Sequence, residues 1–327
     1  MMKHERLMIA LLLLITSWST LLSQDKDVRV GLAWKPGISI DDRVVMAIEF
    51  AGAEAVILNQ VCPAGFDYND GKLDVKYVDT NGVLLTEYAE QIKRNTWHGS
   101  NAAEALSGVD AVVFLGGIDI SSTLFRVPQP WHGLVGDVCD VTRDLSEYLT
   151  MSYCLDHDIP VLGLCRGMQM LGVVSGAAII QDLGNCFAVM GDDYENKHRS
   201  LFDENGKRHY VSHDVVVTDK NSLLYSIVLD DTIKNVPSWH HQVVGGVTGT
   251  QLKVTGVTPT QGVNIIEAIE RTDKSFALGV QFHPEEAVRR YLLGEADAQD
   301  FMPLYEGLAY FRALISKART KKNNNKN

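Results

Sequence analysis

Short apolar runs alternate along this chain with longer segments in which apolar residues recur at roughly helical spacing. A β-branched run at 28–33 is followed by such a segment at 42–52, and an apolar run resumes at 55–58. A strand, a helix and a strand in this order form a unit whose two strands lie parallel. Continuous apolar runs at 111–115 and 160–164 are typical of strands buried on both faces. The pattern predicts an α/β fold, with a doubly wound, mostly parallel sheet, helices on both of its faces, and ligands bound at the carboxyl ends of the strands.

The rest of the chain adds expected elements of both kinds. Helices are expected at 84–94, 102–106, 140–157 and 303–317, and strands at 211–218, 251–258, 265–270 and 276–282. The polar, Gly-containing segment 62–82 predicts an excursion with a small hairpin within 73–78. Residues 182–207 show little periodicity, which predicts either a mobile loop beside the ligand pocket or a solvated connection without function.

The N-terminus has the pattern of a signal peptide. Two basic residues precede an apolar core at 7–15, and several serines follow it. We therefore expect residues 1–23 to be removed during export to the periplasm or to the outside of the cell. An uncleaved N-terminus that anchors the chain in a membrane is the second interpretation, and a cytoplasmic protein with a buried first helix is the third. The remaining chain divides into one domain at 24–318 and a disordered polar tail at 319–327.

Composition and charge narrow the class of partner. The chain has 327 residues, of which 46% are hydrophobic and 22% charged, so it can bury a large core. Its net charge is −11 and no run of basic residues precedes the C-terminus, which argues against a nucleic-acid partner. We expect a small-molecule ligand and no membrane association once the signal peptide is removed, and we leave a homodimer open.

The strongest chemical signal is Gly163-Leu164-Cys165-Arg166-Gly167, where an apolar strand runs directly into a helix. Small residues around such a sharp turn let one side chain project above the sheet, as in the nucleophile elbow of hydrolases. Cys165 is that side chain here, and the positive end of the helix dipole favours its thiolate. The alternative is that Cys165 is a buried small hydrophobic residue, as many free cysteines are.

The chain contains five cysteines, an odd number. In an oxidising compartment, one unpaired thiol is what a catalytic cysteine would leave. Cys186 is the neighbour that would inactivate Cys165 if the two formed a disulfide. Spacing does not decide the pairing of the others, so the disulfide state of Cys62, Cys139, Cys154 and Cys186 is left open.

A second signal, His283-Pro284-Glu285, follows the last predicted strand. Residues two apart in extended backbone point the same way, so His283 and Glu285 are expected to project together while Pro284 ends the strand. A carboxylate beside an imidazole fixes its tautomer and stabilises the imidazolium that forms when the ring takes a thiol proton. A surface turn could also contain this tripeptide by chance. No metal or organic cofactor is expected, because no His/Cys/Asp cluster has ligand spacing and no Gly-rich phosphate loop follows the first strand.

Five motifs in this order resemble the class I glutamine amidotransferase superfamily, and within it the free-standing γ-glutamyl-γ-aminobutyrate hydrolases, also called peptidase family C26. The motifs lie at 114–119, 143–144, 163–169, 238–242 and 279–285. The resemblance extends over nearly the whole mature chain, and it implies a flavodoxin-like fold with a Cys-His-Glu triad.

By position, the resemblance makes Cys165 the nucleophile, His283 the general base and acid, and Glu285 the carboxylate that orients the histidine. It places an oxyanion hole at the backbone N–H groups of Gly117 and Arg166, a role consistent with a Gly-Gly strand end opposite a helix start.

Two further positions match pocket residues of the family. Gln169 matches a residue whose amide holds the glutamyl group, and His240 matches a pocket histidine, for which a packing role is equally compatible. The Arg166 side chain is expected to be solvated at a surface-facing helix start, or else to bind a substrate carboxylate. The implied activity is hydrolysis of a γ-glutamyl amide through a thioester, without a cofactor. The alternatives are a non-catalytic module that binds a γ-glutamyl compound, and the glutaminase component of an amidotransferase.

Overall fold

The computed structural model describes residues 26–40, 42–132 and 139–324. The predicted signal peptide at 1–23 lies outside these residues. None of the helices in the described part of the chain has both the length and the apolar character that a membrane crossing requires.

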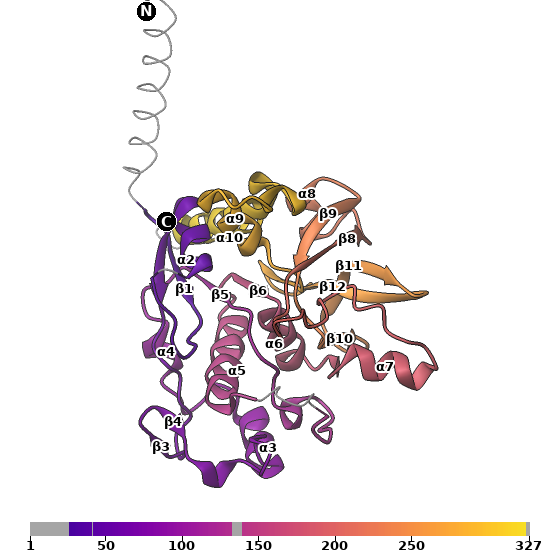
Figure 1. Cartoon of the computed structure of the whole chain (residues 1–327). Helices are drawn as coiled ribbons and strands as arrows, with labels where there is room; N and C mark the ends of the chain where they lie inside the picture. Colours follow the sequence, from indigo (N-terminus) through magenta and orange to yellow (C-terminus); the bar gives the residue numbers. More distant parts are fainter. Residues whose placement is uncertain (1–25, 41, 133–138, 325–327) are drawn as a thin grey trace, which may run out of the picture.

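One large sheet runs through the molecule (Figure 1). Its first five strands are parallel, in the spatial order β2 (Glu54–Ile57), β1 (Arg29–Leu32), β5 (Ala111–Phe114), β6 (Val161–Leu164) and β13 (Ala277–Val280). Four antiparallel strands extend it beyond β13, in the order β12 (Val263–Arg271), β11 (Leu252–Thr260), β8 (Val211–Val217) and β9 (Thr232–Ser238). The doubly wound α/β fold predicted from the sequence is confirmed, and it carries an antiparallel extension on one side.

Helices cover both faces of the sheet. One apolar core lies beneath α2 (Arg43–Phe50), α8 (Leu223–Val228), α9 (Pro284–Leu293) and α10 (Leu304–Asn324). A second core lies beneath α3 (Thr86–Asn95), α4 (Ala102–Ala105), α5 (Val141–Asp156) and α6 (Arg166–Val174). Along β5, Ala111 and Val113 belong to the first core and Val112 and Phe114 to the second, because successive strand residues point to opposite faces. Burial on both faces explains why this strand is a continuous apolar run.

Several smaller elements lie outside the large sheet and the helices that cover it. The hairpin expected within 73–78 lies slightly earlier, as β3 (Tyr68–Asn69) and β4 (Lys72–Leu73). A second short ribbon pairs β7 (Ala178–Ile180) with β10 (Val243–Gly246). The expected loop at 182–207 contains a helix, α7 (Leu183–Met190), whose first turn is capped by the Asp182 carboxylate. This helix is too short to produce a clear apolar period in the sequence, and only the segment after Gly191 is irregular.

The expectation of a disordered tail at 319–327 is wrong for its first part, because α10 continues to Asn324. Ion pairs secure its last turns. Arg319 donates to Asp27 (2.9 Å), Lys322 donates to Asp110 (2.8 Å), and Lys321 contacts Asp158. The polar tail therefore packs on the edge of the domain through charge rather than through apolar burial. The last three residues, 325–327, lie outside the described part.

Candidate active site

The predicted site residues follow three adjacent parallel strands. Leu115–Gly117 follows β5, Cys165 follows β6, and Gln281–His283 follows β13. These strands are neighbours in the sheet, so their carboxyl ends open at one edge. This is the edge at which doubly wound sheets bind ligands. Segments separated by many residues in the sequence thus meet at the edge that the strand pattern predicted.

Cys165 occupies a strained turn between β6 and α6. Its φ is 50° and its ψ is −103°, a backbone conformation that is rare for a residue with a side chain. Its N–H donates to Val280 O (2.8 Å), which secures the turn to β13. A Cβ on Gly163 would collide with the Gly167 backbone, and a Cβ on Gly167 with the Phe114 backbone. The two glycines therefore permit the close packing of helix start and sheet that a nucleophile elbow requires.

His283 and Glu285 meet as predicted, although by a different local geometry. Glu285 lies in the first turn of α9, not in an extended segment, and His283 is the residue that caps this helix. His283 Nδ1 lies 2.7 Å from Glu285 Oε1. Pro284 occupies the first helical position, where a missing N–H costs nothing, so it begins a helix instead of only ending a strand.

Glu285 and Cys165 stabilise a charged ring at His283. Burial opposes that charge, but the Glu285 carboxylate and the Cys165 sulfur more than offset it and raise the pKa of His283 to about 9. A Cβ on Gly116 would overlap the His283 ring and approach Cys165, so only glycine lets the ring lie against the strand end beside the thiol. Arg43 Nε also approaches Glu285 Oε1 (3.5 Å), and Tyr210 packs edge-on against the His283 ring. No sequence pattern pointed to Arg43 or Tyr210, because both come from segments outside the motifs.

Two glutamine side chains connect the Cys165 thiol to the backbone of Gln242 through hydrogen bonds. Gln281 Nε2 lies 3.4 Å from Cys165 Sγ, and Gln281 Oε1 accepts from Gln169 Nε2 (3.3 Å). Gln169 Nε2 also donates to Gln242 O (2.7 Å). Gln169 therefore lies at the site as predicted. Gln281 was part of a recognised motif without an assigned role, and the structure places it against the sulfur.

Cys165 lies between two cavities. A narrow inner cavity of about 120 Å³ is lined by Cys165, Gln169 and a group of polar and aromatic residues: Asp119, Arg199, Trp239, His240, His241 and Gln242, with Gly117 and Ile118. A larger outer cavity of about 340 Å³ is lined by Arg43, Tyr210, Trp239 and His283, together with Gly117, Ile118 and Cys165. A substrate that reaches the sulfur can thus place one part in each cavity.

The inner cavity carries charged groups. His241 lies 3.2 Å from Asp119 Oδ1 and 3.0 Å from Asp182 Oδ2. Burial opposes a charge on His241, but hydrogen bonds to Asp119 and Asp182 more than offset it and raise the pKa of His241 to about 9. Among the described residues, the buried Asp119 Oδ2 has no hydrogen-bond partner. The cavity therefore combines cationic groups with a carboxylate oxygen that can still accept a hydrogen bond.

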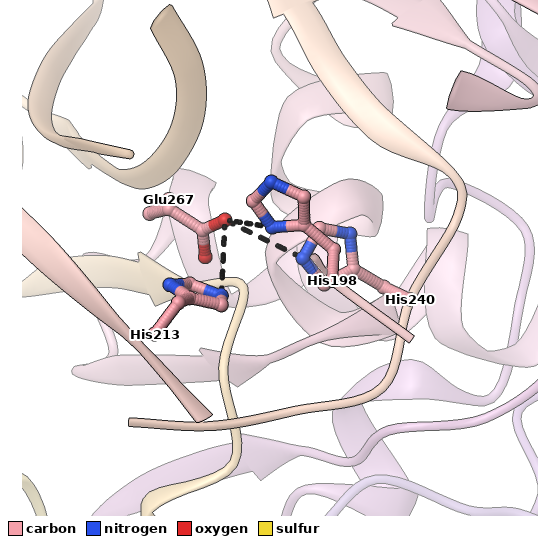
Figure 2. Close-up of side chains that lie close together, drawn as sticks. All are labelled: His198, His213, His240 and Glu267. Atoms are coloured by element: carbon pink, nitrogen blue, oxygen red, sulfur yellow. Dashed lines mark ion pairs between the residues drawn. The ribbon is translucent and has the colours of Figure 1, made fainter. Parts of the chain in front are cut away.

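His240 lies in the same segment, but its ring faces a buried carboxylate. It borders the inner cavity, yet its Nε2 lies 3.4 Å from the buried Glu267 Oε1, beside His198 and His213 (Figure 2). Its side chain is only 1% exposed. The packing interpretation of His240 fits this geometry better than direct contact with a substrate.

The expectation of a solvated Arg166 side chain is wrong. Arg166 is completely buried and forms ion pairs with Asp144 and Glu147, which are also completely buried. Its guanidinium is therefore not available to a substrate carboxylate. Both acids lie on the buried face of α5, beside the buried Arg143. A charged side chain is rarely buried unless it has a partner of opposite charge. The elbow motif did not predict that Asp144 and Glu147 would be the partners of Arg166.

Arg143 links this buried charge cluster to the predicted oxyanion hole. Its Nε donates to Glu147 Oε1 (2.7 Å), and its Nη2 donates to Leu115 O (2.9 Å) and Gly116 O (3.0 Å). A Cβ on Gly117 would overlap the Arg143 guanidinium. The Gly-Gly strand end is thus positioned by a buried arginine, opposite the helix start at Arg166.

All five cysteines are free thiols. Cys186 lies on α7 and lines a separate cavity with Gln129 and Gln181. The structure therefore contains no disulfide between Cys165 and Cys186.

The buried charge cluster generates a test of stability. Glu147→Gln removes the acid that both Arg143 and Arg166 contact, and it leaves buried positive charge without full compensation. We expect the free energy of unfolding to fall by about 3–5 kcal/mol, measured by urea denaturation. The control is Asp231→Asn, which breaks the exposed 2.8 Å ion pair with Lys220 and should leave the unfolding midpoint unchanged. Equal effects of the two substitutions would contradict a structural role for the cluster.

Comparisons with known proteins show which family this chain resembles. The sequence model of the family described as peptidase C26 matches residues 92–285. The chain is 31% identical to protein NtpR of Enterococcus hirae over 185 residues, which cover 56% of this chain and 70% of that protein. It is 26% identical to a γ-glutamyl-γ-aminobutyrate hydrolase of Shigella flexneri over 194 residues, which cover 59% of this chain and 72% of that protein.

A solved structure supports the fold independently of these sequence matches. A protein from Thermoplasma acidophilum, described as part of a GMP synthase, superposes with a TM-score of 0.50 at 14% identity, covering 92% of this chain and 98% of that chain. At this identity the likeness shows the fold alone. The family match covers more than half of the chain, and the chain therefore belongs to the peptidase C26 family, within the glutamine amidotransferase-like proteins.

Proposed function

We propose that the protein is a cysteine hydrolase that cleaves a γ-glutamyl amide bond. The observation that carries this proposal is the position of Cys165. It lies on a strained elbow, beside an imidazole that is hydrogen-bonded to a carboxylate, and between two cavities. Membership of the peptidase C26 family supports the hydrolytic chemistry.

The reaction follows from the positions of the thiol and the imidazole. The Cys165 thiolate attacks the side-chain carbonyl of the γ-glutamyl group, and the C–N bond breaks as His283 gives its proton to the leaving amine. Water then loses a proton to His283 and attacks the thioester. The C–S bond breaks, glutamate is released, and the pair of Cys165 thiolate and His283 imidazolium is restored. Glu285 orients the ring throughout and stabilises its positive charge whenever the ring carries the second proton, before the amine leaves and after water has given up its proton.

The oxyanion of each tetrahedral intermediate needs donors opposite the sulfur. The backbone N–H groups of Gly117 and Arg166 supply them in this proposal. Arg143 acts through the strand end, because it holds the carbonyls of Leu115 and Gly116 and so orients the following N–H. Arg143 is thus a positioning residue, not a catalytic residue.

The inner cavity suits the amino-acid head of a γ-glutamyl group. A glutamyl head carries an α-carboxylate and an α-ammonium group. His241 and Arg199 bring positive charge to the cavity, and Asp119 Oδ2 offers a buried acceptor for the ammonium group. The amine half then extends into the outer cavity, against Tyr210 and Trp239.

The direct test is turnover. The wild-type protein is expected to release product from γ-glutamyl-p-nitroanilide and from γ-glutamyl-γ-aminobutyrate, while Cys165→Ala retains the fold and releases none above the uncatalysed rate. Glutamine serves as a third substrate, with and without a cell extract that could supply an acceptor protein. Equal, slow release by both proteins would show a binding module without catalysis. Activity confined to glutamine and stimulated by a partner would show a glutaminase component.

The pH dependence of kcat/KM reports on His283. The thiolate–imidazolium pair is lost as the pH rises through the raised pKa of His283, so activity should fall above about pH 9. Glu285→Gln removes the charge that raises this pKa, and the alkaline limb should therefore move to lower pH. The control Glu104→Gln changes an exposed carboxylate on α4 and should leave the profile unchanged. An alkaline limb that does not move in Glu285→Gln contradicts the assigned pairing.

Recognition of the glutamyl head is tested by Asp119→Asn. The substitution keeps the size of the side chain but removes its negative charge. We expect kcat/KM to fall by about 10- to 100-fold, equivalent to about 1.5–3 kcal/mol, mainly through KM. Asp192→Asn, an exposed acid in the irregular segment after α7, is the matched control. An unchanged KM in Asp119→Asn, in a protein with an unchanged unfolding temperature, would exclude the proposed contact.

A further inference from the structure

Three histidines surround one buried carboxylate in the antiparallel half of the sheet (Figure 2). Glu267 lies on β12, His213 on β8, His240 between β9 and β10, and His198 in the irregular segment after α7. Glu267 Oε1 lies 3.0 Å from His198 Nδ1, 3.4 Å from His240 Nε2 and 3.7 Å from His213 Nε2. We refer to these four residues as the His₃Glu cluster.

The facing atoms of the cluster lack hydrogen-bond partners of suitable geometry. Among the described residues, this holds for His198 Nδ1, His213 Nε2, His240 Nε2 and both oxygens of Glu267. The side chains of His198 and Glu267 are completely buried, that of His240 is 1% exposed, and that of His213 is 7% exposed. Several polar atoms buried together without partners require a cation or a proton between them.

The outer hydrogen bonds indicate which ring atoms carry protons. His213 Nδ1 lies 3.1 Å from Thr258 Oγ1, and that hydroxyl donates its own proton to Asp214 O (2.8 Å). The hydroxyl must therefore accept from Nδ1–H, which leaves the lone pair of Nε2 facing Glu267. His198 Nε2 lies 3.0 Å from Thr260 Oγ1, a hydroxyl whose own proton is directed at Thr258 O (3.5 Å), and His198 Nδ1 faces Glu267. Two lone pairs that face a carboxylate repel it unless a cation lies between them.

In His198 and His213, one ring nitrogen contacts a threonine hydroxyl on the outside and the other faces Glu267, which is the arrangement that orients histidine ligands of metals. Tetrahedral Zn²⁺ with ligands at about 2.0–2.1 Å places the ligand atoms about 3.3–3.4 Å from one another. The three N···O separations of 3.0, 3.4 and 3.7 Å bracket this value, and all four ligand atoms lie within 4.8 Å of one another. A bound ion would draw the three ring nitrogens, which lie within 4.8 Å of one another, closer together to form a tetrahedral site.

We propose that His198, His213, His240 and Glu267 bind one Zn²⁺ ion as a closed, four-coordinate site. Three imidazoles and one carboxylate favour a first-row transition metal over Ca²⁺ or Mg²⁺, which prefer oxygen ligands. With four protein ligands, no position remains for a reacting water, so the ion is structural. The ligands are far apart in the sequence and come from four separate segments, which is why ligand spacing did not reveal the site and no metal was expected.

The proposed zinc site would connect one wall of the inner cavity, formed by residues 239–241, to the sheet. His240 lies between Trp239 and His241, and all three line this cavity. His198 O accepts from the N–H of His240 (2.9 Å) and from Ser238 Oγ (2.9 Å), so the irregular segment after α7 is tied to the same wall. The ion would hold this segment, the wall and two strands together.

The test measures metal in the untagged full-length protein, since a polyhistidine tag would itself bind metal. After expression with added zinc and exhaustive dialysis, elemental analysis is expected to find one Zn²⁺ per chain. Chelation should lower the unfolding temperature, and Zn²⁺ should restore it. Replacing zinc with Co²⁺ should give the intense visible absorption of a tetrahedral site.

Substitutions locate the ion. Glu267→Gln and His213→Ala should abolish Zn²⁺ retention and the Co²⁺ spectrum, whereas His209→Ala, an exposed histidine outside the cluster, should change neither. If the cluster variants do not fold, the chelation and Co²⁺ measurements on the wild-type protein decide the question alone. Wild-type protein that retains no zinc and gives no Co²⁺ spectrum overturns the proposal in favour of a proton-bound cluster. Retention that is equal in folded His213→Ala and folded Glu267→Gln also overturns it, because the metal then binds elsewhere.

Discussion

The ion pairs of Arg166 with Asp144 and Glu147 connect the elbow to the layer of helices beneath it. Removing such charges from water costs several kcal/mol per ion, so the arrangement is tolerable only when every partner is in place. The start of α6, the inner face of α5 and, through Arg143, the strand end at Gly116 are all positioned by this one cluster. The geometry around Cys165 therefore depends on charges that no ligand can reach.

The parallel half of the sheet supplies the reactive groups of the site, and the antiparallel half supplies one wall of its inner cavity. The parallel strands bring together the thiol, the imidazole and the glycine strand end, all from carboxyl ends at one edge. The antiparallel strands hold the wall that contains Trp239, His240 and His241. The reactive atoms thus follow the parallel strands, whereas the shape of the inner cavity depends on the antiparallel strands. Changes in the antiparallel strands could therefore alter the substrate without altering the chemistry.

Much of this arrangement could be predicted from the sequence, because it follows from local patterns. The apolar runs located the buried strands, and the glycines around Cys165 located the elbow. The pairing of His283 with Glu285 was predicted correctly for the wrong geometric reason, since the contact joins the residue that caps α9 to a residue in the first turn of that helix, not two residues of an extended segment. The burial of Arg166 and the convergence of His198 and His213 on Glu267 could not be predicted. They depend on tertiary contacts between distant segments, for which no periodicity exists.

The end of α10 combines two kinds of attachment. Leu308, Phe311 and Leu314 are buried in the core beneath the sheet, whereas Arg319 and Lys322 form ion pairs with the partly exposed carboxylates of Asp27 and Asp110. Salt screens exposed charges over about 10 Å at 0.1 M ionic strength but leaves apolar burial intact. In concentrated salt the last turn of α10 should fray while its first turns remain docked, so the attachment of α10 to the segments just before β1 and β5 depends on ionic strength.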